Sequence, residues 1–291
     1  MGTMETAPLT LCELNALPAP AFVAALGEVF EHAAWVAEAA AQGRPYPTVT
    51  ALHDAMMQAV RQAPPAQLRA FIGGHPELGS RVRRTDITQD SQAEQGGLGL
   101  DQLSAEEFDR FSRLNAAYRE KFGFPFIVCV RRHTRDSILR EFERRLAHDT
   151  NAEHAAALHE IGLITRLRLV ALVGGPGVPV TTGWLSTHVL DTVTGRPAPN
   201  VRITLHEVGH SARSLLMETR TNADGRTDAP LISGGPLRAG TYELTFHMGD
   251  YFGGASFIGD VPIRFSITEP ESHYHVPLLV TPWSYTTYRG S

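Results

Sequence analysis

Apolar residues in the first part of the chain recur every three or four positions, which is the spacing of amphipathic helices. The clearest run holds Phe22, Leu26, Val29, Phe30, Ala33 and Ala37. Similar runs predict further helices over residues 50–63, 104–122, 135–147 and 151–173. Ser104, which precedes two glutamates, and Thr50, which precedes His53 and Asp54, are typical of helix starts. The pattern predicts an all-α domain over residues 1–173.

The second part of the chain has a different period. Short runs alternate apolar with polar residues, as half-buried strands do, and cover residues 201–205, 242–246 and 263–267. Turn-forming residues separate such runs at positions 222–225 and 234–236. We therefore predict an all-β, antiparallel sandwich of about seven or eight short strands over residues 183–291. The protein is thus expected to be multidomain.

Between the two patterns, residues 174–179 read Gly-Gly-Pro-Gly-Val-Pro, which no helix continues through. We interpret residues 174–182 as a linker between the domains. A phosphate-binding loop is the alternative, but the Lys-Ser/Thr pair and the helix start that such a loop requires do not follow.

Composition narrows the function classes. A chain of 291 residues with 43% hydrophobic content can bury two cores. Its net charge is −5 and neither half is basic, which argues against a nucleic-acid partner. Apolar runs are too short to span a membrane and the start is not signal-like, so we expect a cytoplasmic protein. Cys12 and Cys129 do not suggest a disulfide framework.

One motif resembles a zinc site. Residues 206–210 read His-Glu-Val-Gly-His, and the HExxH pattern binds zinc when a helix brings both histidines onto one face. Here the motif continues an alternating, strand-like run, where residues i and i+4 lie about 13 Å apart. We therefore predict that the two histidines do not share a metal, and that the metalloprotease interpretation is the weaker one.

Three segments of the second half carry candidate chemistry. Residues 185–191 read Leu-Ser-Thr-His-Val-Leu-Asp, residues 221–226 read Thr-Asn-Ala-Asp-Gly-Arg, and His-Tyr-His at 273–275 is followed by a terminal Tyr-Arg-Gly-Ser at 288–291. On these motifs, residues 183–291 resemble the 5-hydroxyisourate hydrolases, the transthyretin-related enzymes of urate breakdown. The resemblance implies a transthyretin-like sandwich.

The resemblance also implies site residues. The catalytic set would be His188, Arg226, His275 and Ser291, and the substrate-binding set Tyr288, Arg289 and Gly290. Histidine titrates near neutral pH and suits water activation, whereas an always-charged arginine suits an oxyanion. Which histidine is the base stays open. His273 shares the sheet face of His275, so the choice between them rests on the resemblance. A transthyretin-like carrier without chemistry is the rival interpretation.

The first half carries a second set of motifs. They read Phe-Ile-Gly-Gly-His-Pro-Glu-Leu-Gly at 71–79, Ser-Gln-Ala-Glu-Gln at 91–95, Lys-Phe-Gly-Phe-Pro-Phe-Ile at 121–127 and Leu-Ile-Thr-Arg-Leu-Arg-Leu at 163–169. This half resembles the 2-oxo-4-hydroxy-4-carboxy-5-ureidoimidazoline decarboxylases. The resemblance implies that His75 and Glu94 are catalytic and that Pro76 and Arg168 bind substrate. Arg166 is the alternative to Arg168.

Together the resemblances imply two consecutive reactions on one chain. The second domain would hydrolyse 5-hydroxyisourate, and the first would decarboxylate the product to (S)-allantoin. We expect no cofactor and no metal, small-molecule substrates, and a homo-oligomer, with a tetramer formed through the sandwich. In one alternative only the hydrolase is active and the helical half is structural; in another the sandwich is a binding module.

Overall fold

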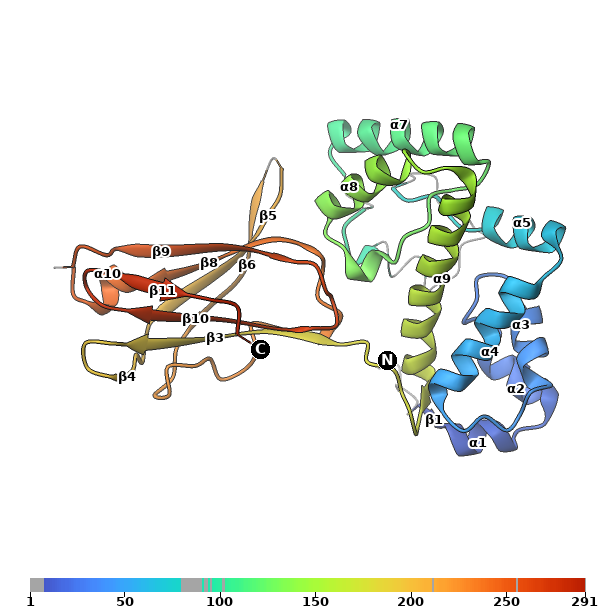
Figure 1. The fold of residues 1–291 in the computed structure, drawn as a ribbon, viewed down its shortest axis with the longest axis horizontal. Coiled ribbons are helices and arrows are strands. Elements are labelled where there is room, and N and C mark those ends of the chain that lie inside the picture. Colours follow the sequence, from blue (N-terminus) through green and yellow to red (C-terminus); the bar gives the residue numbers. More distant parts are fainter. Residues whose placement is uncertain are drawn as a thin grey trace, which may run out of the picture. The chain divides into compact units, whose positions relative to one another are not determined.

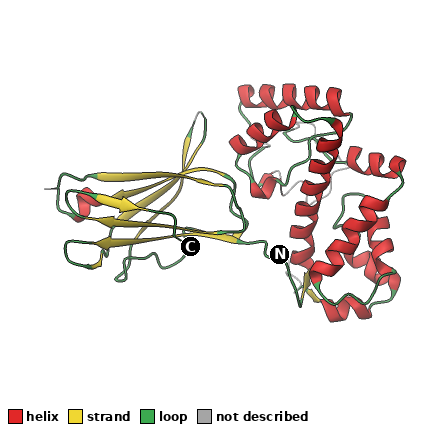
Figure 2. Ribbon diagram, viewed as in Figure 1, coloured by secondary structure: helices red, strands yellow, loops and turns green. Residues whose placement is uncertain are grey.

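The computed structural model describes residues 8–79, 91, 94, 96–100, 103–210, 212–254 and 256–290. The chain divides into two compact units. Unit 1 comprises residues 1–130 and 139–181, and unit 2 comprises residues 131–138 and 182–291. Helices dominate the first part of the chain and strands the second (Figures 1 and 2), which confirms the predicted fold class.

The helices follow the predicted order closely. They are α1 (Leu11–Ala16), α2 (Ala19–Leu26), α3 (Ala34–Ala41), α4 (Val49–Gln62), α5 (Pro65–Gly73), α7 (Ala105–Phe122), the short 3-10 helix η1 (Val130–Arg132), α8 (Arg135–Arg145) and α9 (Thr150–Leu172). Ser104 caps α7, and its hydroxyl accepts from the backbone N–H of Glu107 in a capping box, as predicted. Within the described residues, no helix has the length and apolar character needed to cross a bilayer.

The run from Phe22 to Ala37 is not one helix, and this prediction was wrong. Helix α2 ends at Leu26, and Gly27 follows it as its cap. Two tight turns then lead to α3, and His32 takes a positive φ of 50° that no helix residue has. Glycine and the turn therefore override the apolar spacing. The break places Glu31 between the helices rather than along one of them.

The start of α4 also differs from the prediction. Thr48, not Thr50, caps the helix, and its hydroxyl accepts from the backbone N–H of Ala51. The hydroxyl of Thr50 instead donates to the carbonyl of Gly177 at 2.7 Å. The beginning of the Gly/Pro segment is thus hydrogen-bonded to unit 1, where β1 (Leu9–Thr10) and β2 (Val173–Gly174) also pair in parallel.

The β unit consists of two sheets that enclose one apolar core. Its strands are β3 (Gly183–Asp191), β4 (Arg196–Pro197), β5 (Arg202–Val208), β6 (Arg213–Arg220), β7 (Ile232–Gly235), β8 (Gly240–His247), β9 (Asp260–Ile267), β10 (His273–Val280) and β11 (Tyr285–Thr287), with the short α10 (Met248–Tyr251) after β8. Among the described residues, one sheet has the order β11-β10-β3-β4, with β7 also on β3, and the other β6-β5-β8-β9. Leu185, Leu244 and Leu278 are fully buried between them.

One pairing departs from the antiparallel expectation. Strand β10 runs parallel to β3 over its whole length, with His275 opposite Ser186 and Pro277 opposite His188. Strand β9 belongs to the other sheet, so the chain changes sheets before β10 and can enter beside β3 in the same direction. Local alternation predicts the strands but not this choice of partner.

The HExxH motif lies where its strand-like context predicts. His206 and Glu207 are part of β5, which ends at Val208, and His210 follows in the turn. The motif therefore lacks the helical geometry through which two histidines four residues apart reach one zinc ion.

A buried ionic cluster holds one segment of the helical unit in place. The side chains of Arg145 and Glu153 are 1% and 0% exposed, and Arg145 Nε donates to Glu153 Oε1 at 2.8 Å. Arg145 Nη1 also donates to the carbonyl of Ile127 at 2.7 Å, and the Tyr118 hydroxyl donates to Glu153. The cluster thus ties α7, α8 and α9 to the loop that contains Ile127.

We predict that Glu153→Gln lowers the free energy of unfolding of the helices by about 3–5 kcal/mol, because it leaves the Arg145 charge buried without its counter-ion. Urea unfolding followed by circular dichroism at 222 nm measures this loss. Glu141→Gln removes the partly exposed partner of the exposed Arg144 and is the matched control, with an expected change within about 0.5 kcal/mol. Equal effects of the two substitutions would contradict the prediction.

Candidate active sites

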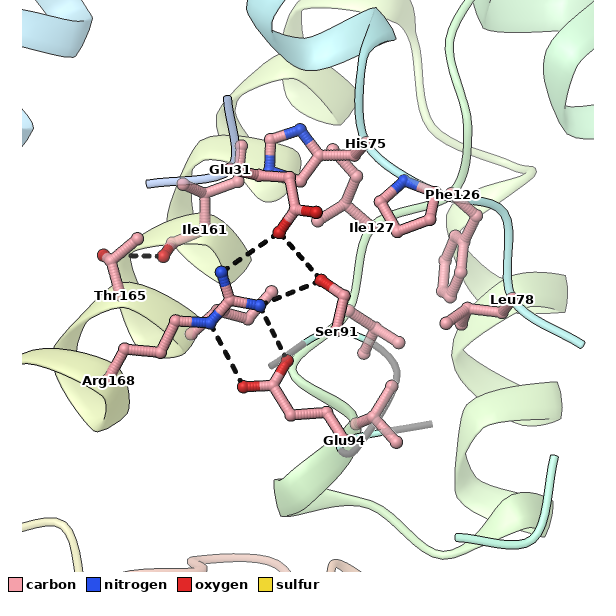
Figure 3. A pocket seen from close by; sticks show the side chains of 14 residues that line it. Glu31, His75, Leu78, Ser91, Glu94, Phe126, Ile127, Ile161, Thr165 and Arg168 are labelled. Atoms are coloured by element: carbon pink, nitrogen blue, oxygen red, sulfur yellow. Dashed lines mark hydrogen bonds and ion pairs between the residues drawn. The ribbon is translucent and has the colours of Figure 1, made fainter. Parts of the chain in front are cut away.

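Arg168 on α9 is the centre of the first candidate site. Its side chain is 5% exposed, and its guanidinium contacts two carboxylates. Nε and Nη2 donate to Glu94 at 3.3 and 3.0 Å, and Nη1 donates to Glu31 Oε2 at 3.1 Å. The Ser91 hydroxyl accepts from Nη2 at 3.0 Å and donates to Glu31 at 2.8 Å (Figure 3). Burial opposes the charge on Arg168, but the carboxylates outweigh it and raise its pKa.

His75 lies just after the end of α5 and faces the same cavity. The ring packs edge-on against Phe71 at 5.1 Å, and Nδ1 lies 3.0 Å from the Phe71 carbonyl. Since a carbonyl only accepts, the hydrogen is on Nδ1 and the lone pair is on Nε2. Burial lowers the pKa of His75 to about 4, although the Phe71 carbonyl and Glu31 act in the opposite direction. His75 is therefore neutral at neutral pH.

The cavity brings together four residues that the sequence indicated, His75, Pro76, Glu94 and Arg168. Arg166 does not line it. Three further polar residues, Glu31, Ser91 and Thr165, do. Ser91 was visible as the first residue of the Ser-x-x-Glu motif, whereas Glu31 was hidden within a run interpreted as helix. Apolar side chains form the remaining wall: Leu78, Phe126, Ile127, Val128, Val130, Ile161 and Ile164.

The second candidate site lies on the exposed face of the β3 and β10 pair. His188 points to this face from β3 and His275 from β10, since the parallel register places Pro277 opposite His188. Arg226 forms an isolated antiparallel bridge with His188. A side chain at Gly225, whose φ is 69°, would approach the Val189 carbonyl to 2.4 Å, so glycine is required for Arg226 to come this close.

The chain end reaches the same site. Gly290 pairs with His275 in a second isolated bridge, and its backbone N–H donates to the His275 carbonyl at 2.8 Å. Tyr288, Arg289 and Gly290 line a concavity with His273 and His275. Arg289 itself pairs with Glu269 at 3.0 Å on the outside. Ser291 lies outside the described residues.

Electrostatics favour neutral imidazoles in this site as well. Burial, followed by the charge of Arg226, lowers the pKa of His188. Burial also lowers the pKa of His275, with further contributions from Arg226, His273 and His188. His188 Nε2 is buried and has no hydrogen-bond partner among the residues that the structure describes. The site thus combines histidines whose neutral form is favoured with the cation of Arg226, an exposed residue whose backbone pairs with His188.

Comparisons with known proteins agree with this division. Residues 15–170 match the family described as OHCU decarboxylase, and residues 185–290 match the HIUase/Transthyretin family. The 5-hydroxyisourate hydrolase of Deinococcus radiodurans is 54% identical over 113 residues, which are 37% of this chain and 95% of that protein. The 2-oxo-4-hydroxy-4-carboxy-5-ureidoimidazoline decarboxylase of Haloferax volcanii is 42% identical over 161 residues, 55% of this chain and 94% of that protein.

One solved structure spans both parts. The crystal structure of (S)-allantoin synthase matches with 35% sequence identity and a TM-score of 0.52 and covers 97% of this chain and 100% of that chain. The chain therefore belongs to the OHCU decarboxylase family through residues 15–170 and to the HIUase/transthyretin family through residues 185–290.

Proposed function

We propose that the two sites perform consecutive steps of urate degradation in this bifunctional hydrolase and decarboxylase. The site around His188 and His275 opens 5-hydroxyisourate with water, and the site around Arg168 decarboxylates the product to (S)-allantoin. One observation carries the assignment: His75, Glu94 and Arg168, which lie far apart in sequence, line a single cavity together with Glu31.

Ring opening requires a base for water and a partner for the oxyanion. A neutral imidazole of His188 or His275 takes the proton of a water molecule, and the water oxygen attacks the ring amide carbonyl. The Arg226 guanidinium stabilises the negative charge that develops on the carbonyl oxygen. Tyr288, Arg289 and Gly290 line the concavity beside these groups.

Decarboxylation requires that the electron pair of the breaking C–C bond be received and that a proton be delivered to one face. His75 accepts a hydrogen bond from the substrate hydroxyl through Nε2, since Nδ1–H is engaged with the Phe71 carbonyl. Glu94 hydrogen-bonds to the ring or ureido nitrogens. Both Nε and Nη2 of Arg168 contact Glu94, which favours a role for this arginine in orienting that carboxylate. The apolar wall suits the release of neutral CO2.

Three further proposals rest on the sequence: the domain bounds on its periodicity and Gly/Pro segment, the assembly on the family resemblance, and the location on its short apolar runs. The domains extend over residues 1–173 and 183–291, with the linker at 174–182. The protein assembles as a homo-oligomer, a tetramer through the β unit. It acts in the cytoplasm on small-molecule substrates.

The two steps are predicted to be separable by mutation. His188→Ala abolishes accelerated ring opening and leaves decarboxylation intact, whereas His75→Ala does the reverse. Freshly made 5-hydroxyisourate is followed by absorbance for the first step and by circular dichroism for the second, because uncatalysed loss of CO2 gives racemic product. His206→Ala, on the other sheet, is the control and retains both steps. Loss of both activities from one substitution would contradict the site assignment.

The pH dependence of decarboxylation is predicted to reflect neutral His75. Its pKa is lowered to about 4, so the base keeps its lone pair from pH 7 down to about 5 and loses it as the pH falls through about 4. The kcat/KM for decarboxylation, measured with pre-formed ureidoimidazoline and corrected for its spontaneous decay, should fall along an acid limb near that value. An acid limb near 6.5, the ordinary value for histidine, would contradict this role.

Glu31 is predicted to contribute to decarboxylation by fixing Arg168. Glu31→Gln removes one of two carboxylates at the buried guanidinium and should lower kcat/KM for decarboxylation by about 10- to 100-fold, a typical effect of removing an orienting partner. Steady-state kinetics of both steps measure it, and ring opening should be unchanged. Glu28→Gln, three positions earlier and exposed, is the matched control. Wild-type decarboxylation by Glu31→Gln would rule out this contribution.

A further inference from the structure

The hydroxyl of Ser186 lies between two imidazoles on the β3 and β10 face. Ser186 Oγ is 2.8 Å from His273 Nε2 and 2.9 Å from His275 Nδ1. The register makes this possible, because Ser186 is opposite His275 and Trp184 is opposite His273 in the parallel pair. The indole of Trp184 stacks on His273 with centroids 4.6 Å apart and planes at 23°. The ring-opening site described above uses His275 but neither Ser186 nor His273.

A serine hydroxyl carries one hydrogen, so it donates to one imidazole and accepts from the other. Two arrangements satisfy both contacts. In the first, Nδ1–H of His275 donates to Ser186, and Ser186 donates to Nε2 of His273. Nε2 of His275 then keeps its lone pair and can act as a base. In the second, both hydrogen bonds are reversed and Nε2 of His275 carries a hydrogen.

We propose that Ser186 and His273 are positioning residues for ring opening, which select the basic tautomer of His275 and relay to His273 the proton that it takes from water. The proposal rests on the proposed function of this site. It assigns roles to two residues of the motifs at 185–191 and 273–275 that the resemblance left without one.

The proton transfers balance. The O–H bond of water breaks and its proton bonds to Nε2 of His275, while the hydroxide electron pair forms the bond to the amide carbonyl carbon. Nδ1–H of His275 breaks and its proton bonds to Ser186 Oγ, whose own proton bonds to Nε2 of His273. The result is one oxyanion beside Arg226 and one imidazolium at His273. Reversal of the chain returns the proton to the leaving nitrogen.

The order of residues along the face favours this direction. His188, which bridges to Arg226, is at one end, His275 is in the middle, and His273 is at the other end. Transfer to His273 therefore moves positive charge away from the Arg226 guanidinium. The stacked Trp184 ring provides an electron-rich face for the imidazolium. Besides the two histidines, the ionisable residues that line the concavity within the described part of the chain are Tyr288 and Arg289, and the Arg289 side chain pairs with Glu269.

The test combines three variants with kinetics in mixed H2O and D2O. Ser186→Ala removes the relay hydroxyl, and Ser186→Thr keeps it. His273→Asn keeps a polar group but cannot become a cation. We expect kcat for ring opening to fall about 100-fold in Ser186→Ala and His273→Asn, with KM changed less than about threefold, and to recover in Ser186→Thr. The wild type should give a curved proton inventory, and the two impaired variants a linear one.

Controls separate this proposal from a folding defect and from the proposed function. Decarboxylation by the same variants reports on the integrity of the rest of the chain and should be unchanged. Ser214→Ala and His206→Asn, on the other sheet, are the matched controls and should keep wild-type ring opening. If Ser186→Ala and His273→Asn keep the wild-type rate and the curved proton inventory while His275→Ala is inactive, the relay is wrong and the site stands. If the wild type does not accelerate ring opening, the proposed function itself fails.

Discussion

Burial of charge is the constraint on which the helical unit depends. A guanidinium in the interior costs several kcal/mol unless counter-ions and hydrogen bonds compensate it. Arg145 meets this requirement through Glu153, and Arg168 meets it through two carboxylates, Glu31 and Glu94. Arg145 ties the loop around Ile127 to three helices, and that loop then forms one wall of the cavity in which Arg168 holds its carboxylates. The Arg145 cluster therefore helps to shape the candidate site around Arg168.

Desolvation also acts on the histidines of both sites, but these side chains become neutral, whereas the buried arginines stay charged. An imidazole can lose its proton, and burial lowers the pKa values of His75, His188 and His275, so these rings stay neutral. A neutral imidazole has a defined donor and a defined acceptor, and the neighbour of one nitrogen decides the role of the other. The Phe71 carbonyl, which only accepts, does this for His75. At His275 the neighbour is the Ser186 hydroxyl, to which our proposal gives the same role.

Much of this architecture could be predicted from the sequence because periodicity and caps are local signals. Residues within a few positions of one another predict the helical and β halves and the cap at Ser104. They also predict the strand that contains the first residues of the HExxH motif. Tertiary choices could not be predicted in this way. The parallel pairing of β10 with β3 depends on the sheet to which β9 belongs. The turn that places Glu31 against Arg168 interrupts a run whose apolar residues keep helical spacing before and after it. Motif resemblance indicated His75, Glu94 and Arg168, but only the structure identified Glu31 as the second carboxylate at Arg168.

Close approach of backbone segments brings the parts of the β site together. Arg226 reaches His188 only because Gly225 has no side chain, and Gly290 approaches the His275 ring so closely that a Cβ would lie 2.8 Å from Cδ2. Strands β3 and β10 carry the imidazoles and the Ser186 hydroxyl on one face. Gly225 and Gly290 allow the loop before Arg226 and the end of the chain to lie against that face. In the proposed function the chemistry resides on the strands, and the two glycines determine how closely the Arg226 backbone and the end of the chain approach them.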